Sequence, residues 1–146
     1  MHIDTETHRH LTRQLDLIPV DTLTKPVTII GCGAIGSFLA LSLAKMGMTD
    51  LFLMDPDVVS IENMSNQFFP KSLIDVNKAK ALSTLIYNFT DETVKWTPIA
   101  YTPDQSNLLA GIVVVAVDSM EARRMVYDSI KEKNFQVDYI IDPRIS

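Results

Sequence analysis

The stretch Val27-Thr28-Ile29-Ile30-Gly31-Cys32-Gly33-Ala34-Ile35-Gly36 decides the fold of this chain. Its first four residues form a mainly apolar run that is too short for a helix and stops at Gly31, which is typical of a buried parallel strand. Apolar residues then recur from Ile35 to Ala44 at helical spacing, and Gly47 ends that pattern. A strand, a glycine turn and a helix in this order predict the start of a parallel α/β sheet.

The alternation of strands and helices continues along the chain. We expect further strands at 51–54, 94–100, 111–117 and 137–141, helices at 76–89 and 119–133, a polar loop over 56–73 and a short helix or turn at 104–109. This order predicts a Rossmann-like parallel sheet with helices on both faces. The chain stops after the fifth strand, so we expect one domain over 1–146 whose sheet is truncated there. A polar helical pattern at 5–17 predicts an N-terminal helical arm within residues 1–24.

The glycine turn is suited to hold a nucleotide phosphate. Its first glycine permits the tight turn, the second lets the backbone approach the phosphate, and the third lets the helix pack on the strand. The start of the helix adds free N–H groups and the positive end of the helix dipole. Asp55 directly follows the second strand, where an acid can accept hydrogen bonds from ribose hydroxyls. We expect nucleotide contacts from Gly31, Gly33, Ala34, Ile35 and Gly36. These features fit NAD, FAD and ATP equally.

Composition and charge exclude several classes of protein. Hydrophobic residues make up 47% and charged residues 21% of the chain, which is ordinary for a globular core. The net charge of −5 gives no basic footprint for nucleic acid. No apolar run approaches the roughly 18 residues of a membrane span. Cys32 is the only cysteine, so it forms no internal disulfide and we expect a cytoplasmic protein. Its place in a glycine turn favours packing over a catalytic thiol.

The residues after Asp55 carry the most specific signal. They read Asp55-Pro56-Asp57-Val58-Val59, then Glu62-Asn63-Met64-Ser65-Asn66-Gln67, then Asp75-Val76-Asn77-Lys78-Ala79-Lys80. This series resembles the ThiF/MoeB/HesA family, which includes the ubiquitin-activating enzymes and has the patterns D-x-D-x-V, S-N-x-x-R-Q and D-I-G-x-x-K. The family's D-N-x-x-x-R and an upstream R-Q pair are similar to Asp118-Ser119 with Arg123 and to Arg13-Gln14. The resemblance extends from about residue 9 to residue 144.

The resemblance implies an ATP-dependent adenylyltransferase. Its substrate is the C-terminal carboxylate of a small ubiquitin-like or sulfur-carrier protein, and its cofactors are ATP and Mg²⁺. In adenylation a carboxylate attacks the α-phosphate, so the site needs fixed cations and a metal ion. Lys80, at the start of a helix, can reach the phosphates, and Asp118, after the fourth strand, can hold Mg²⁺. Arg13 would act across a homodimer interface.

The resemblance also assigns four nucleotide contacts. It implies that Asp55 and Asp57 lie on the ribose side and that Asn63 and Gln67 lie along the phosphates. Without the resemblance, Asp118 could cap the following helix, and Lys78 or Lys80 could be a solvated helix charge. Arg123 fits a structural role as well as a catalytic one.

The chain departs from the family patterns at several positions. Asn66 replaces the arginine before the glutamine, which removes one cation that would neutralise phosphate charge. Asn77 replaces a glycine and is a residue that tolerates a left-handed backbone. Glu62 and Ser119 replace the family's serine and asparagine. Two other functions therefore stay open. One is an NAD(P)-dependent oxidoreductase, and the other is a non-catalytic nucleotide-binding or dimerising scaffold.

Overall fold

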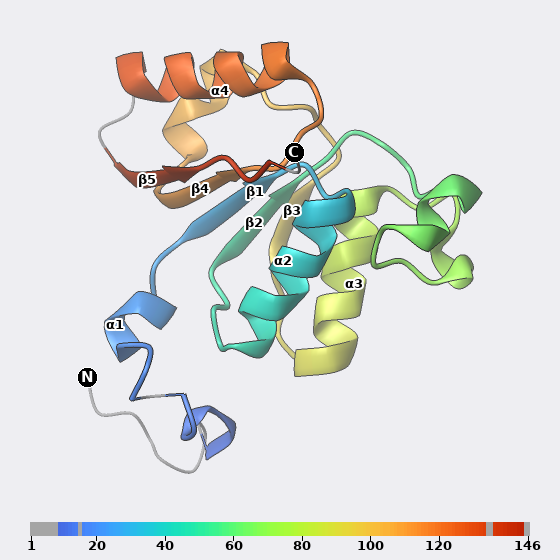
Figure 1. The fold of residues 1–146 in the computed structure, drawn as a ribbon, viewed down its shortest axis with the longest axis vertical. Helices are drawn as coiled ribbons and strands as arrows, with labels where there is room; N and C mark the ends of the chain where they lie inside the picture. Colours follow the sequence, from blue (N-terminus) through green and yellow to red (C-terminus); the bar gives the residue numbers. More distant parts are fainter. Residues whose placement is uncertain (1–8, 15, 134–135, 145–146) are drawn as a thin grey trace.

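A computed structural model describes residues 9–14, 16–133 and 136–144 (Figure 1). They form a five-stranded sheet in the order β3-β2-β1-β4-β5, in which every pair of neighbours is parallel. The strands are β1 (Val27–Ile30), β2 (Leu51–Met54), β3 (Lys95–Thr97), β4 (Gly111–Val115) and β5 (Val137–Ile141). The strand order reverses direction at β1, which confirms the predicted Rossmann-like sheet and marks the edge where ligands bind in such folds.

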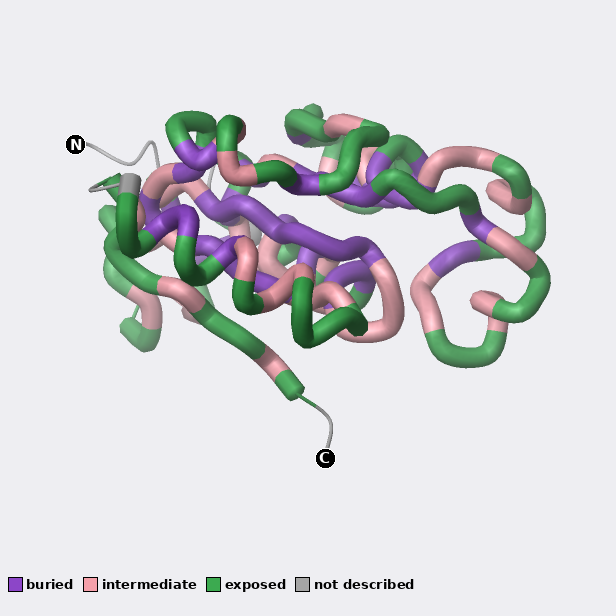
Figure 2. Tube along the Cα trace, turned by 90° about the horizontal axis from the view of Figure 1, so that it is seen from above, coloured by how far each residue is buried: buried purple, intermediate pink, exposed green. Residues whose placement is uncertain are grey.

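Helices cover both faces of the sheet, as the sequence predicts (Figure 1). The helices α2 (Ala34–Lys45) and α3 (Lys78–Thr90) pack on one face, and α4 (Met120–Lys133) packs on the other. Along β1 successive side chains alternate between the two cores: Ile29 belongs to the α2/α3 side and Ile30 to the α4 side. All four residues of β1 are therefore buried, which explains the continuous apolar run in the sequence (Figure 2).

The N-terminal arm differs from the expected helix. In the described part of 5–17 the chain forms a 3₁₀ turn, η1 (Arg9–Leu11), followed by further turns, and α1 spans only Val20–Leu23. Residues 1–8 and 15 lie outside the described residues. Arg9–Leu11 are thus helical in the 3₁₀ form, whereas residues 12–14 form turns, because contacts with the C-terminal end of α2 decide the conformation of the arm. Leu11 is buried against Gly47, and the Gln14 side-chain amide donates to the carbonyl of Met46.

The connections between strands and helices contain short 3₁₀ helices. They are η2 (Ile61–Ser65), η3 (Lys71–Leu73) and η4 (Pro103–Leu108). The last of them lies where a short helix or turn is predicted at 104–109. The segment between β2 and α3 projects beyond the carboxyl ends of the strands (Figure 1). Among the described residues, no helix is both long and apolar enough to cross a bilayer.

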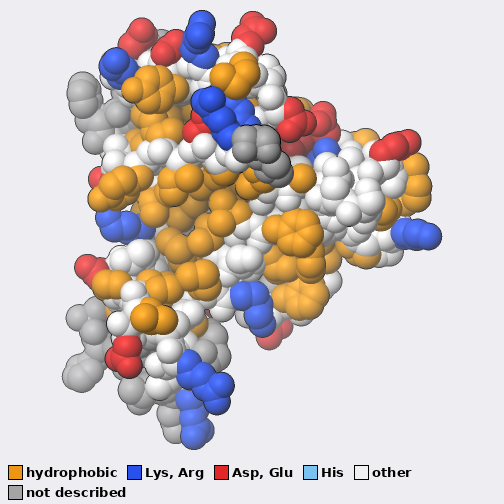
Figure 3. Space-filling model, in the orientation of Figure 1, with side chains coloured by type: hydrophobic (Ala, Val, Ile, Leu, Met, Phe, Trp, Pro, Cys, Tyr) orange, Lys and Arg blue, Asp and Glu red, His pale blue; other side chains and the backbone are white. Residues whose placement is uncertain are grey.

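One face of β5 carries exposed apolar side chains. Tyr139 is 63% exposed and Ile141 is 48% exposed, whereas Ile140 of the same strand packs into the core beneath α4. Figure 3 shows a broad area of apolar side chains between α4 and the N-terminal arm. An exposed apolar surface of this kind is typical of a contact with another protein.

Candidate nucleotide site

A pocket of about 440 Å³ lies where the sheet order reverses, at the carboxyl ends of β1, β2 and β4. It brings together residues that are far apart in the sequence. The sequence-predicted residues that line it are Gly31, Gly33, Ala34, Asp55, Asp57, Gln67 and Asp118. Asn66, Lys78 and Tyr101 line it as well. Its position agrees with the general rule for ligand sites in open parallel sheets.

The glycine turn is shaped by two close backbone approaches. Gly31 has φ +98°, and a Cβ atom there would lie 2.7 Å from the carbonyl oxygen of Ala116. A Cβ atom on Gly36 would lie only 1.9 Å from the carbonyl oxygen of Gly31, so the third glycine allows α2 to pack against the turn. Gly36 and Ile35, which we expected to contact the nucleotide, are not among the residues that line the pocket.

Asp55 joins two backbone segments at the floor of the pocket. It is 5% exposed, and its carboxylate accepts hydrogen bonds from the backbone N–H groups of Cys32, at 2.7 Å, and Asp57, at 2.8 Å. Burial raises the pKa of Asp55, although the two N–H donors and the nearby Lys78 cation act in the opposite direction. The carboxylate is therefore already fixed in position before a ligand arrives.

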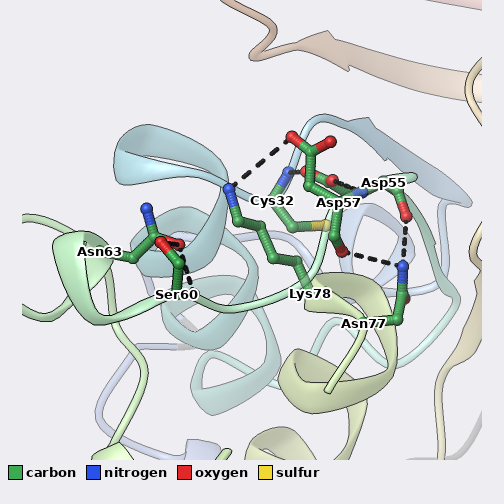
Figure 4. Close-up of polar contacts among 7 residues, drawn as sticks. All are labelled: Cys32, Asp55, Asp57, Ser60, Asn63, Asn77 and Lys78. Carbon is green, nitrogen blue, oxygen red and sulfur yellow. Dashed lines mark hydrogen bonds and ion pairs between the residues drawn. The ribbon is translucent and has the colours of Figure 1, made fainter. Parts of the chain in front are cut away.

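The two lysines at the start of α3 lie in different environments, and Figure 4 shows that of Lys78. Lys78 lines the pocket, and its Nζ lies 3.9 Å from the Asp57 carboxylate. Lys80, to which the sequence analysis assigns the phosphate contact, is exposed and does not line the pocket. The difference has a simple geometric reason: residues two apart on a helix point about 200° away from each other. Of these two lysines, only Lys78 is therefore in the lining of the pocket.

Asn77 links the acidic segment after β2 to α3. Its amide nitrogen donates to the carbonyl oxygens of Asp55, at 2.8 Å, and Asp57, at 3.0 Å (Figure 4). Its Oδ1 accepts from the Lys80 N–H at 3.1 Å. Its φ is −53°, so Asn77 does not use the left-handed backbone that asparagine tolerates. Asp75 has φ +70° instead. The side chain of Asn77 thus makes contacts that a glycine cannot make.

Gln67 and Asn66 line the pocket, but Asn63 does not. The Oε1 atom of Gln67 is buried without a hydrogen-bond partner among the described residues, so it can accept from a ligand. Asn63 accepts a hydrogen bond from the N–H of Ser60 at 2.9 Å and caps η2 (Figure 4). This hydrogen bond helps to fold the loop, and the predicted phosphate contact of Asn63 stays a prediction.

Asp118, Ser119 and Arg123 lie close together in the sequence at the start of α4, but each has a different environment. Asp118 is exposed and lines the pocket. The Ser119 hydroxyl accepts from the Ala122 N–H at 3.2 Å, so Ser119 caps the helix and Asp118 is free of that task. Arg123 is largely buried, and its guanidinium donates to the Val115 carbonyl and to Asp142. Arg123 therefore has the structural role that the sequence left open.

An apolar part of the pocket comes from segments on the α4 side of the sheet. Tyr101 is buried, and its hydroxyl is 2.7 Å from the Ser129 hydroxyl. Met54 and Val126 belong to the same core and line the same pocket. A wall of this kind suits the flat face of a nucleobase. The sequence analysis missed Tyr101, because no periodic pattern or motif surrounds it.

Three further features bear on the chemistry of the chain. Arg13 is exposed and does not line the pocket. Within the described residues, no cluster of three or more His, Cys, Asp or Glu side chains could hold a metal ion.

Cys32 is completely buried, and burial, followed by the charge of Asp55, strongly raises the pKa of its thiol. A thiol in that state is a poor nucleophile, so Cys32 acts in packing.

A larger groove of about 1000 Å³ lies between α4 and β5. Its charged groups include Arg123, Arg144 and Asp142, which pair with one another. The glycine turn and the carboxylates after β2 do not contribute to it. The smaller pocket is therefore the candidate site.

The chain matches the model of the ThiF family over residues 12–137. It is 31% identical over 122 residues to the NEDD8-activating enzyme E1 catalytic subunit of Schizosaccharomyces pombe, a match that covers 77% of the chain and 27% of that protein. It is also 31% identical over 126 residues to ubiquitin-like modifier-activating enzyme 5 of Drosophila simulans, covering 75% of the chain and 31% of the relative. The chain thus spans about a third or less of the length of these relatives.

Solved structures share the fold. The E. coli tRNA N6-threonylcarbamoyladenosine dehydratase TcdA superposes with a TM-score of 0.82 at 19% identity, covering 95% of this chain and 62% of that one. E. coli MccB, solved with AMPCPP and MccA, gives a TM-score of 0.69 at 20% identity, covering 86% and 36%. The match to the family model covers most of the residues that form the sheet and the pocket. The chain therefore belongs to the ThiF family.

Proposed function

We propose that this chain is the nucleotide-binding part of an ATP-dependent adenylyltransferase. Its substrate would be the C-terminal carboxylate of a small ubiquitin-like or sulfur-carrier protein. The observation that carries this proposal is that one pocket combines the glycine turn with Asp55, Asp57, Lys78 and Asp118. Hydride transfer to NAD needs the turn and Asp55, but it has no need of a cation and a further carboxylate beside them.

The chemistry of adenylation fits this set of groups. A carboxylate oxygen of the carrier forms a bond to the α-phosphorus of ATP, and pyrophosphate leaves with the electrons of the broken P–O bond. Negative charge builds on the phosphates, so the site must supply positive charge. Two relatives are named as activating enzymes for NEDD8 and for a ubiquitin-like modifier, and TcdA has been solved with ATP. These names support the proposed substrate class and cofactor.

Asp118 is the proposed ligand for Mg²⁺. Magnesium is usually held by one or two carboxylates together with the phosphates of the substrate, so a single pocket carboxylate is sufficient. Without a metal ion, the carboxylate of Asp118 would repel a triphosphate. With Mg²⁺ bound, the ion would supply positive charge where the family's arginine is replaced by Asn66.

Arg13 is proposed to serve the pocket of a second copy of the chain. The arm that carries it is fixed by Leu11 and Gln14 to Gly47 and Met46, at the C-terminal end of α2. The glycine turn lies at the opposite end of this 12-residue helix, about 18 Å away. The arm is therefore directed away from its own pocket. The exposed apolar face of β5 is the surface that would pair in such a homodimer.

Calorimetric titration of the chain with ATP and Mg²⁺, and separately with NAD, tests the nucleotide preference. We expect ATP to bind more tightly, and tighter binding of NAD would instead support an oxidoreductase. Exchange of labelled pyrophosphate into ATP, measured with the carrier protein present, then tests the reaction. Nucleotide binding without exchange would indicate the non-catalytic scaffold.

A further inference from the structure

We propose that Ser37 and Phe68 are positioning residues of the nucleotide pocket, because together they fasten the loop between β2 and α3 onto α2. The loop brings Asn66 and Gln67 into the wall of the pocket, whereas Ser37 and Phe68 do not line it themselves. The inference rests on the proposed function for the identity of the ligand. We use the name loop fastening for the hydrogen bond between Ser37 and Phe68 together with the ring contacts of Phe68.

The loop, residues 55–77, is closed at its neck by backbone hydrogen bonds. The N–H of Val59 donates to the carbonyl of Val76 at 2.8 Å, and the N–H of Asp75 donates to the carbonyl of Val59 at 2.8 Å. These bonds fix the place where the loop leaves the sheet and the place where it returns to α3. Gln67 lies near the middle of the loop, so the neck alone does not determine its position. A contact in the middle of the loop has to do so.

A buried hydroxyl group on α2 supplies this contact. The Ser37 Oγ accepts a hydrogen bond from the backbone N–H of Phe68 at 3.0 Å. Ser37 is 0% exposed and lies near the start of α2, directly after Gly36. A hydroxyl group at a fully buried position costs free energy unless it is hydrogen-bonded. The hydroxyl of Ser37 therefore has a specific use, which is to bind the loop.

The aromatic ring of Phe68 reinforces the hydrogen bond. It packs edge-on against the ring of Phe38 in α2, with ring centroids 5.1 Å apart, and its centroid lies 6.4 Å from that of Phe89 in α3. Both separations lie within the range in which aromatic rings attract each other. The next residue, Phe69, is buried in the core on the α2/α3 side of the sheet. The loop is thus attached to both helices directly beside Gln67.

The loop fastening connects two sides of the phosphate end of the pocket. The helix α2 begins at the glycine turn, and the N–H of Ser37 donates to the carbonyl of Gly33 one helical turn earlier. From Ser37 the hydrogen bond leads to Phe68, which directly follows Gln67. The Nε2 atom of Gln67 lies 3.7 Å from the point that a Cβ atom on Gly33 would occupy, so the amide reaches the glycine turn. One helical turn and one hydrogen bond therefore set the distance between the glycine turn and the loop.

Ser37→Ala and Ser42→Ala in the full chain form a matched pair for testing this inference. Each removes one hydroxyl group from α2, but the Ser42 Oγ donates within the helix, to the carbonyl of Phe38. Calorimetry with ATP and Mg²⁺, and with adenosine, separates the phosphate end of the pocket from the contacts to base and ribose. We expect Ser37→Ala to weaken ATP about fivefold, the factor for one ordinary hydrogen bond, and adenosine less than about twofold. Ser42→Ala should leave both within about twofold.

Limited proteolysis measures the loop fastening without a ligand. Lys71 is an exposed residue of the loop, and trypsin cleaves after it when the loop leaves its folded position. We expect this cleavage to be about fivefold faster in Ser37→Ala than in wild type or Ser42→Ala. Phe68→Leu keeps an apolar side chain and the backbone N–H but loses the ring contacts, so it should change the cleavage rate and the ATP affinity in the same direction. Mass spectrometry of the fragments identifies the cleavage site.

The outcomes are distinct. If wild type binds ATP and Ser37→Ala has the same ratio of ATP to adenosine affinity, the positioning role is overturned while the proposed function stands. Equal losses in Ser37→Ala and Ser42→Ala would overturn it as well, because they would reflect the helix and not the loop. If wild type binds neither ligand, the proposed function fails, and equal cleavage rates in the three proteins would then also overturn the loop fastening. If Ser37→Ala does not fold, Phe68→Leu supplies both measurements.

Discussion

The carboxylate of Asp55 and the backbone N–H of Cys32 are joined by a 2.7 Å hydrogen bond that links the end of β2 to the glycine turn after β1. The same carboxylate receives the N–H of Asp57 at 2.8 Å. Asp55 therefore lines the pocket and also connects its walls, so its titration should affect the stability of the fold.

The stability of the chain should respond to pH through Asp55. Burial raises the pKa of Asp55 in the folded protein above its value near 4 in the unfolded chain. At a pH between these two pKa values, Asp55 is protonated more often in the folded state than in the unfolded state. The contribution of Asp55 to the free energy of unfolding must then fall as the pH rises through this window. We expect Asp55→Asn to gain stability relative to wild type from pH 4 to pH 7. Urea denaturation of both proteins across that range measures the difference, and a constant difference would contradict the prediction.

Gly36→Ala and Gly33→Ala should have opposite phenotypes. A methyl group on Gly36 meets the Gly31 carbonyl at 1.9 Å, so α2 must shift, with a loss of stability of about 1–3 kcal/mol or more. A methyl group on Gly33 meets only the Gln67 amide nitrogen, at 3.7 Å. Gly33→Ala should therefore fold normally, while its methyl group reduces ATP binding because Gly33 lines the pocket. Thermal melts and calorimetry compare the two variants, and equal stabilities would contradict this account.

Native Cys32 should resist alkylation. Its side chain is fully buried and its thiol pKa is raised, so reaction with iodoacetamide at neutral pH requires unfolding. We expect labelling about 10³-fold or more slower than in urea-unfolded protein, as the folding equilibrium of a small domain allows. Mass spectrometry over time gives both rates. Comparable rates would mean that the glycine turn opens freely.

Asp118→Asn should abolish most of the Mg²⁺-dependent pyrophosphate exchange and leave the fold intact. Because Ser119 caps α4, the substitution changes the charge without removing a helix cap. The loss of one well-placed electrostatic group costs about 10²–10³ in rate. The assay uses the longest form of the protein with its carrier, and Ser119→Ala serves as the control for the cap. Near wild-type exchange by Asp118→Asn at low Mg²⁺ would remove Asp118 from the metal site.

The chain should associate with itself at micromolar concentration through β5. Tyr139→Asp places a charge on the exposed apolar face, so this variant should sediment as a monomer where wild type sediments as a dimer. Arg13→Ala should leave the dimer intact, because Arg13 is proposed to act in the partner's pocket. Analytical ultracentrifugation of the three proteins decides the question. A monomeric wild type would exclude Arg13 from the site.

The sequence predicts the sheet well, because buried parallel strands are read from short apolar runs such as Val27–Ile30 and Gly111–Val115. It also predicts the glycine turn and the acidic segment, because each is recognised from residues that are close together in the sequence. The turns at 12–14 do not follow from the sequence pattern, because Leu11 obtains its burial from Gly47, a contact that the helical pattern does not contain.

The side chains of the site are harder to predict than the fold. The motif places a lysine at the start of α3, but the rotation of the helix decides that Lys78 faces the pocket. Asn63 fits the motif yet folds its own loop, because local hydrogen bonds compete for an asparagine side chain. Tyr101 reaches the pocket through the packing of η4 and α4, which no local pattern describes.

The strand order has a consequence for how the protein folds during synthesis. The segments that form β1, β2 and β3 leave the ribosome first and can pair at once, whereas the second edge of β1 stays open until Gly111–Val115 follow. Until then the nascent chain presents an apolar strand with unpaired backbone groups, the feature that promotes aggregation. We therefore expect substitutions that slow the pairing of β4 with β1 to lower the yield of folded protein more than they lower its final stability.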